Sequence, residues 1–253
     1  MFPLHSPGQA PPDNVVRMRR FEAFFIVAVV SLAMCGCRKN HSAQQAADSA
    51  TTAESQPEAT PALPTAAQPD NRPLLVCFGD SLTAGAGTGS GESYPDYLQT
   101  DLNARGYHYR VVNEGISGNT TKDAVARLDH ILALKPAVVV VEFGGNDGLR
   151  GLPIQDSRTN LDKIITTLQA AGVKVALAGI TLPPDYGPDY IKQFNTTYTL
   201  LAKKHRVPML PFLLKGVYGV PGMMQSDQTH ATAAGNKIVA ENVLPLVLPL
   251  LKK

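Results

Sequence analysis

The sequence predicts one α/β domain in which a parallel β-sheet is covered by helices on both faces. Two observations indicate this fold class. Short, continuous apolar segments recur along residues 73–253, and such segments are typical of strands buried on both faces of a sheet. Segments with the apolar spacing of helices separate them, and this alternation predicts a parallel sheet. A length of about 180 residues fits a single domain.

Five strands are expected, in chain order, at residues 73–78, 109–112, 137–141, 173–180 and 207–210. The first four are continuous apolar runs without polar alternation, so we expect them to be buried on both faces. The last is short. Cys77 lies in the first strand and is the only cysteine after Cys37. This excludes an internal disulfide in the domain and favours a small, buried, apolar role for Cys77.

Helices are expected at residues 94–105, at 121–134, around 161–168, at 195–206 and at 233–244, because apolar residues in these segments recur on one helical face. Pro245 and Pro249 should break or kink the end of the last helix. In an open parallel sheet, ligands bind beyond the carboxyl ends of the strands. The chemistry is therefore sought in the loops after Phe78, Val112, Phe143 and Ile180.

The net charge of the chain indicates which class of binding partner to expect. Lys and Arg number 23 against 21 Asp and Glu, a formal net charge of +2, and 44% of the 253 residues are hydrophobic. Binding to nucleic acid through phosphates requires clustered cations, so this balance argues against a nucleic-acid partner. A small or apolar partner is expected instead.

Residues 1–37 have the pattern of a bacterial leader. A basic patch at Arg17, Arg19 and Arg20 precedes the apolar run 24–34, which is too short to span a bilayer and fits a signal peptide. Gly36 directly before Cys37 resembles the lipoprotein signal, in which the cysteine is lipidated. Simple secretion is the alternative, and Met18 is an alternative start.

Residues 38–72 are rich in Ala, Gln, Ser, Thr and Pro and have few large apolar side chains. Such a segment cannot bury enough surface to offset the entropy of ordering, so we expect a disordered tether. The folded domain is then 73–253. The protein is expected outside the cytoplasm, either in the periplasm or anchored to a membrane through Cys37.

Ser81 is a candidate nucleophile, because it follows the first strand in Gly79-Asp80-Ser81-Leu82. The glycines at 85–91 do not fit the register of a dinucleotide-binding loop. Serines in such loops more often cap a helix or close a turn. His230 could activate Ser81, because Asp227 lies three residues before it and can orient the imidazole. Taken alone, this pair is more commonly a capped turn beside a surface histidine.

Two further loops offer hydrogen-bond donors for a carbonyl oxygen that gains charge. Gly118 follows the second strand and allows a close backbone approach, and Asn146 follows the third strand and offers a side-chain amide. Both kinds of donor suit the oxyanion hole of an acyl-transfer site. Glycine loops by themselves are more often plain turns.

The blocks Gly79-Asp80-Ser81-Leu82, Gly118, Gly144-Gly145-Asn146-Asp147 and Asp227-x-x-His230, in this order, resemble the GDSL or SGNH hydrolase family. The resemblance covers residues 73–253 and implies a flavodoxin-like three-layer α/β/α sandwich. It implies Ser81 as nucleophile, Asp227 and His230 as its partners, and Ser81, Gly118 and Asn146 as oxyanion donors, with no metal or cofactor. The segments 141–151, 182–187 and 207–212 are similar to the bacterial periplasmic acyl-CoA thioesterase, lysophospholipase and arylesterase type.

The substrate expected from this resemblance is a small-molecule carboxylic ester or thioester. An apolar lining for a medium-length acyl chain is expected from Leu149, Pro184, Tyr186, Met223 and Met224. A carbohydrate O-deacetylase of the same fold is an alternative, which predicts a shallow polar cleft and a preference for acetyl groups. A non-catalytic binding domain on the cell envelope is a second alternative, which need not keep all five site residues. Acyl-chain length and oligomeric state are left open.

Overall fold

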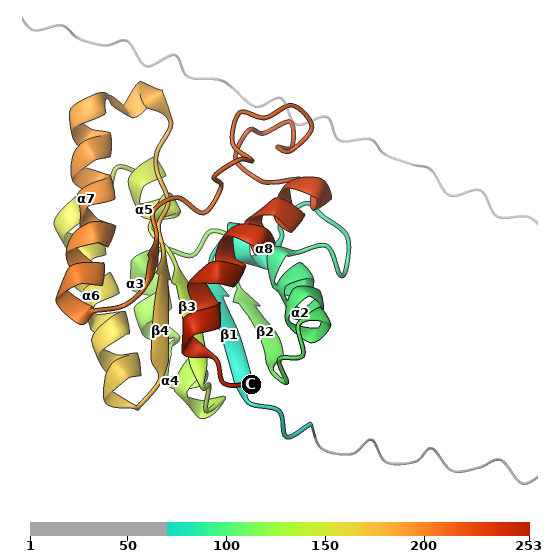
Figure 1. Cartoon of the computed structure of the whole chain (residues 1–253). Coiled ribbons are helices and arrows are strands. Elements are labelled where there is room, and N and C mark those ends of the chain that lie inside the picture. The colour runs from blue at the N-terminus through green and yellow to red at the C-terminus, as the bar shows by residue number, and fades with distance from the viewer. Residues whose placement is uncertain (1–69) are drawn as a thin grey trace, which may run out of the picture. The chain divides into compact units, whose positions relative to one another are not determined.

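The structure is a computed structural model that describes residues 70–253 (Figure 1). The expected leader, Cys37 and residues 38–69 of the expected tether lie outside the described residues, so these assignments stay predictions. No helix in the described part of the chain is long and apolar enough to cross a membrane.

A parallel sheet of five strands forms the centre of the domain. The strands are β1 (Leu74–Gly79), β2 (Arg110–Gly115), β3 (Val138–Glu142), β4 (Lys174–Ala178) and β5 (Met209–Leu210). They lie side by side in the order β2-β1-β3-β4-β5, and every pair is parallel. This is the order of a flavodoxin-like sheet, so the predicted fold class is confirmed.

The strands differ in burial according to their place in the sheet. β1 and β3, at the centre, are buried along their whole length, and Cys77 is buried among them. β2 is an edge strand, and none of its six residues is buried. The expectation that this segment is buried on both faces was wrong, because an apolar run such as Val111-Val112 does not reveal which strand occupies an edge.

Helices cover both faces of the sheet (Figure 1). One face carries α2 (Tyr94–Ala104) and α8 (Ala233–Val247), which pack against each other. The other carries α3 (Thr121–Ala126), α4 (Leu128–Ala133), α6 (Ile154–Ala170) and α7 (Pro188–His205). The short helices α1 (Ser81–Ala84) and α5 (Gly145–Leu149), together with the 3₁₀ turns η1 (Pro184–Tyr186) and η2 (Leu248–Leu250), complete the described elements.

The single helix predicted at 121–134 is divided at Arg127 into α3 and α4. The Arg127 guanidinium donates hydrogen bonds to the backbone oxygen and the carboxylate of Glu114 and to Oδ1 of Asn119. It also lies 5.0 Å from the centre of the Phe78 ring. These contacts hold Arg127 toward the end of β2, and the helical spacing of the sequence gives no indication of them.

The last helix continues through Pro245 to Val247, so this proline does not end it, although a break or a kink was expected here. Proline cannot donate a hydrogen bond to the carbonyl of the residue four positions earlier. Here that residue is Glu241, and both Glu241 and Pro245 are exposed, so water can satisfy the carbonyl. The regular helix nevertheless ends two residues later.

Candidate active site

Ser81 begins the short helix α1 directly after the central strand β1. Asp80 caps this helix, with its Oδ1 accepting a hydrogen bond from the Leu82 N–H at 3.1 Å. This cap turns the chain sharply out of the sheet at its carboxyl edge. The Ser81 side chain is thereby presented at the edge where ligands bind in open parallel sheets.

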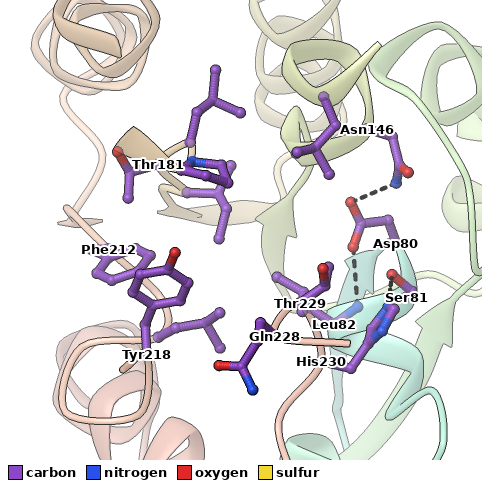
Figure 2. A pocket seen from close by; sticks show the side chains of 16 residues that line it. Asp80, Ser81, Leu82, Asn146, Thr181, Phe212, Tyr218, Gln228, Thr229 and His230 are labelled. Carbon is purple, nitrogen blue, oxygen red and sulfur yellow. Dashed lines mark hydrogen bonds between the residues drawn. The ribbon is translucent and has the colours of Figure 1, made fainter. Parts of the chain in front are cut away.

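His230 and Asp227 lie beside Ser81, although they are almost 150 residues away in the sequence. The Ser81 Oγ is 2.8 Å from Nε2 of His230, and Nδ1 of His230 is 2.7 Å from Oδ2 of Asp227. A carboxylate can only accept, so Nδ1 carries the proton and the lone pair of Nε2 faces Ser81 (Figure 2). This arrangement can remove the proton of the serine hydroxyl.

The turn that holds His230 is fixed from two sides. Asp227 Oδ1 accepts hydrogen bonds from the N–H groups of Thr229 and His230, at 2.9 and 3.0 Å. The bond to the His230 side chain, and then these two backbone bonds, lower the pKa of Asp227 to about 2. The backbone N–H of Gln225 donates a hydrogen bond to the His230 backbone oxygen. The Gln225 side chain donates from Nε2 to the backbone oxygen of Ala86. The histidine turn is therefore tied directly to the loop that follows Ser81.

Three groups were expected as donors to an oxyanion. Within residues 70–253, the N–H groups of Ser81 and Gly118 donate to no other residue. The amide of Asn146 donates to Oδ2 of Asp80 and to the backbone oxygen of Asn119, both at 3.0 Å. Asn119 follows Gly118, so the two loops are joined at this point. Two backbone donors are thus free, whereas the Asn146 amide must exchange a bond to reach a substrate.

Gly118 has φ +81°, a conformation that favours glycine. Its carbonyl accepts a hydrogen bond of 2.9 Å from the Arg150 guanidinium. A Cβ at this position would lie 3.6 Å from that guanidinium, which is ordinary contact. The glycine is therefore required by its backbone conformation and not by lack of space.

Two carboxyl groups next to these residues are buried. Burial raises the pKa of Asp80 to about 6, against the opposing effect of its hydrogen bonds from Leu82 and Asn146. Asp147 accepts hydrogen bonds from the N–H and hydroxyl of Thr121 and from the hydroxyl of Ser157. Asp147 therefore joins α5 to α3 and α6, which is a bracing role and not a contact with Ser81.

A cavity of about 130 Å³ opens beside Ser81, His230 and Asn146. Figure 2 shows Thr181, Phe212 and Tyr218 on the side of this space opposite Asp80 and Ser81. Most of the remaining wall is apolar and comes from four segments of the chain: Leu82, Leu149, Ile180, Leu182, Pro183, Phe212, Leu214 and Tyr218.

Of the five residues expected to line an acyl pocket, only Leu149 lies in the cavity wall. Pro184 lies in a separate surface hollow beside α7, and Tyr186 stacks on Tyr190. Met224 is buried in the core, and Met223 packs against the core. These four residues therefore lie outside the wall of this cavity, although the Tyr186 hydroxyl does donate to the backbone oxygen of Leu149 at 2.8 Å.

Sequence reasoning missed Phe212, Leu214 and Tyr218, which follow β5 and supply one side of the cavity. A usable signal was present, because the end of β5 lies at the same edge of the sheet as the end of β1. Ligands of open parallel sheets bind at this edge, so the apolar residues just after β5 were candidates for the cavity wall. Among residues 70–253, no three His, Cys, Asp or Glu side chains gather as they would to hold a metal ion.

The sequence is similar to a known protein family and to several known proteins. The model of the GDSL-like lipase/acylhydrolase family matches residues 77–238. The chain is 45% identical over 178 residues to esterase TesA of Pseudomonas aeruginosa, covering 70% of this chain and 89% of that protein. It is 37% identical over 170 residues to an arylesterase of Vibrio mimicus, covering 67% and 85% of the two chains. It is 36% identical over 177 residues to thioesterase 1/protease 1/lysophospholipase L1 of Escherichia coli K12, covering 70% and 84%.

Solved structures also resemble the domain. The crystal structure of TesA matches with a TM-score of 0.69 at 45% identity and covers 70% of this chain and 99% of that chain. The psychrotrophic esterase EstA from Pseudoalteromonas, solved with a monoethylphosphonate inhibitor, matches with a TM-score of 0.66 at 31% identity, covering 69% and 96%.

Proposed function

The chain belongs to the GDSL-like lipase/acylhydrolase family and is a serine hydrolase of ester or thioester bonds, and we propose that its Ser81, His230 and Asp227 side chains carry out this hydrolysis. The observation that supports these roles is the continuous hydrogen-bonded line from Ser81 Oγ through the imidazole to Asp227. A nucleophile, a base and a group that orients the base are the parts that covalent acyl transfer requires.

The first half of the reaction forms an acyl-enzyme. The Ser81 Oγ bonds to the carbonyl carbon of the substrate while its proton moves to Nε2 of His230. Asp227 holds the Nδ1 proton and stabilises the charged imidazolium. When the tetrahedral intermediate collapses, the bond to the alcohol or thiol breaks, and that leaving group takes the proton from Nε2.

The second half releases the acid. A water molecule gives a proton to Nε2 of His230 as its oxygen bonds to the acyl carbon. The bond to the Ser81 Oγ then breaks, and Ser81 recovers its proton from His230. The same three side chains therefore serve both half-reactions, and the net change is the hydrolysis of one ester or thioester bond.

The oxyanion of each tetrahedral intermediate is proposed to bind the N–H groups of Ser81 and Gly118 and the amide of Asn146. Support comes from the two backbone N–H groups, which have no other acceptor within residues 70–253. The Asn146 amide would give up its bond to the Asn119 carbonyl when charge develops on the substrate, because an anionic acceptor makes a stronger hydrogen bond than a neutral one.

The apolar cavity beside Ser81 is proposed to receive the acyl chain. Its volume of about 130 Å³ corresponds to roughly four groups of the size of a water molecule. Each methylene that enters should contribute about 0.8 kcal/mol of binding. Butyryl and hexanoyl esters should therefore be better substrates than acetyl esters. The carbohydrate deacetylase alternative expects a shallow polar cleft, which this mainly apolar wall does not favour.

A series of nitrophenyl esters from acetate to decanoate, run beside a panel of acetylated sugars, tests this function. We expect kcat/KM to rise from acetate to hexanoate by roughly tenfold for every two buried methylenes. The Ser81→Ala variant should lose nearly all turnover, whereas Ser90→Ala, at an exposed serine of the following loop, should keep it. Faster turnover of acetyl sugars than of any nitrophenyl ester would favour the deacetylase instead.

The location outside the cytoplasm also remains a proposal. It is supported by the basic patch and the apolar run in residues 17–34 and by Gly36-Cys37. In this proposal Cys37 is the first residue of the mature chain and carries the lipid, and residues 38–72 link it to the domain. The catalytic residues all lie after residue 72, so catalysis would not depend on the anchor.

A further inference from the structure

A wholly buried carboxyl group, Glu142, lies beneath the turn that carries Ser81. Glu142 is the last residue of β3, next to β1 in the sheet. Its Oε2 accepts a hydrogen bond from the Thr83 hydroxyl at 2.9 Å and a longer one from the Asp80 N–H at 3.4 Å. Its Oε1 has no hydrogen-bond partner in the described part of the chain. The reaction proposed above gives this group no role.

The contacts of Glu142 surround the nucleophile. Asp80 immediately precedes Ser81, and Thr83 follows it by two residues, so one carboxyl oxygen binds the turn on both sides of Ser81. The Thr83 hydroxyl is also 3.2 Å from the Tyr94 hydroxyl. Since the single proton of Thr83 points to Glu142, Tyr94 donates to Thr83. This buried chain of hydrogen bonds fastens the turn to both β3 and α2.

Gly79 makes this arrangement sterically possible. A Cβ at Gly79 would overlap the Thr83 hydroxyl and lie 2.6 Å from Oε2 of Glu142. Both atoms would then have to move, and the bond between them would be lost. The glycine at the start of the Gly-Asp-Ser-Leu block therefore leaves room for the contact between the carboxyl group and the turn.

The protonation state of Glu142 follows from its surroundings. Burial raises the pKa of Glu142 well above its usual range, and the charge of the neighbouring Asp80 raises it further. An ionised Glu142 would have an unpartnered oxygen, Oε1, in a buried site close to a second carboxyl group, which is costly. The neutral acid avoids a buried charge beside Asp80, and its Oε2 still accepts from the Thr83 hydroxyl and the Asp80 N–H.

We propose that Glu142, as an uncharged acid, is a positioning residue that holds the nucleophile turn through Asp80 and Thr83. It touches neither the substrate nor the reacting atoms, and it acts by fixing the Ser81 Oγ against His230 and the Ser81 N–H toward the oxyanion. The proposal rests on the proposed role of Ser81 as nucleophile. It predicts that the shape and hydrogen bonding of residue 142 matter and that a negative charge there does not.

Steady-state kinetics of Glu142→Ala and Glu142→Gln on nitrophenyl butyrate test this inference. We expect Glu142→Ala to lower kcat by about 10- to 100-fold with KM changed less than twofold, because a small misplacement of reacting groups is costly. Glu142→Gln should return kcat to within about threefold of the wild type. Its kcat/KM should follow pH as that of the wild type does. The matched control is Val140→Ala, which removes buried volume from the same strand and should lower the melting temperature without lowering kcat.

Two outcomes would overturn the proposal. A folded Glu142→Gln protein as slow as Glu142→Ala would show that the charge is needed, and a Glu142→Ala protein at the wild-type kcat would show that nothing is positioned. Should Glu142→Ala not fold, Thr83→Val replaces it, with an expected loss in kcat of about tenfold that Thr83→Ser restores. Labelling by a phosphonate separates the two proposals. The variants should still react at Ser81, only more slowly, whereas reaction of the wild type elsewhere would refute the role of Ser81 itself.

Discussion

Replacing Asp227 by Asn removes the charge beside His230 and keeps the shape of the side chain. The Asn side-chain oxygen can still accept the backbone hydrogen bonds from Thr229 and His230. The atom that faces Nδ1 of the imidazole, 2.7 Å away from it in the wild type, becomes an amide that donates. The imidazolium formed during the reaction then has no anion to stabilise it, and the tautomer with its lone pair toward Ser81 is disfavoured.

The exposure of the pair sets the expected size of the effect. The side chain of Asp227 is 48% exposed and that of His230 is 24% exposed. Two opposite charges about 4 Å apart attract by about 1 kcal/mol in water and by about 4 kcal/mol near a protein surface. An intermediate value of about 2 to 3 kcal/mol corresponds to a loss of roughly 10²-fold in kcat. This is the loss from the charge alone. The disfavoured tautomer adds to it, and we expect the total to stay below the roughly 10⁴-fold loss found where the aspartate of such a triad is buried.

The assay is kcat and KM for nitrophenyl butyrate at pH 8, with Asp129→Asn as the matched control. Asp129 is an exposed aspartate on α4, and its replacement should leave kcat within twofold. A loss of less than threefold for Asp227→Asn would mean that this carboxylate does not assist His230. A loss of 10⁴-fold or more, equal to that of Ser81→Ala, would refute the reasoning from solvent exposure.

Three further predictions concern other parts of the chain. Asn146→Ala should lower kcat by about 10²- to 10³-fold with little change in KM, and steady-state kinetics showing an unchanged kcat would limit Asn146 to joining the loops. Because the pKa of Asp80 is raised to about 6 in the folded state, this group stabilises the fold below about pH 4 and loses that contribution as the pH rises through about 6. Asp80→Asn should remove this loss of stability. The free energy of unfolding in urea is measured at pH 4 and pH 7 for both proteins, and an equal change between the two pH values would contradict the prediction. The Cys37→Ser protein should be absent from the membrane fraction of the native host and should keep its esterase activity. Release of the wild-type protein by salt alone, with a free amino terminus, would rule out the lipid anchor.

Much of the fold could be predicted because local pattern determines it. The central strands are continuous apolar runs that can only be buried, and the parallel arrangement follows from the helices between them. The pattern carries no information about position in the sheet, so β2 was expected to be buried. Nor does it reveal side chains that bind across elements, such as Arg127, which donates to Glu114 at the point where the predicted helix is divided.

The candidate site could likewise be predicted only in part from the sequence. Ser81, His230 and Asp227 could be selected from residue type, spacing and the ordered blocks, and the structure brings these three side chains into contact. The cavity wall could not be selected in this way, because it is assembled from four segments that meet only at the edge of the folded sheet. Glu142 was overlooked since it ends an apolar strand, and its contact with Thr83 depends on the register of β3 beside β1.

The central claim is that Ser81 forms the covalent acyl-enzyme. The most direct measurement is the mass of the intact protein after inactivation by a nitrophenyl phosphonate, followed by location of the adduct in peptides. We expect one phosphonyl group per chain, on Ser81, with loss of esterase activity in proportion to labelling. Ser81→Ala should take up none, and Ser90→Ala should be labelled like the wild type. Full inactivation with Ser81 unmodified, or an adduct on any other residue, would contradict the account.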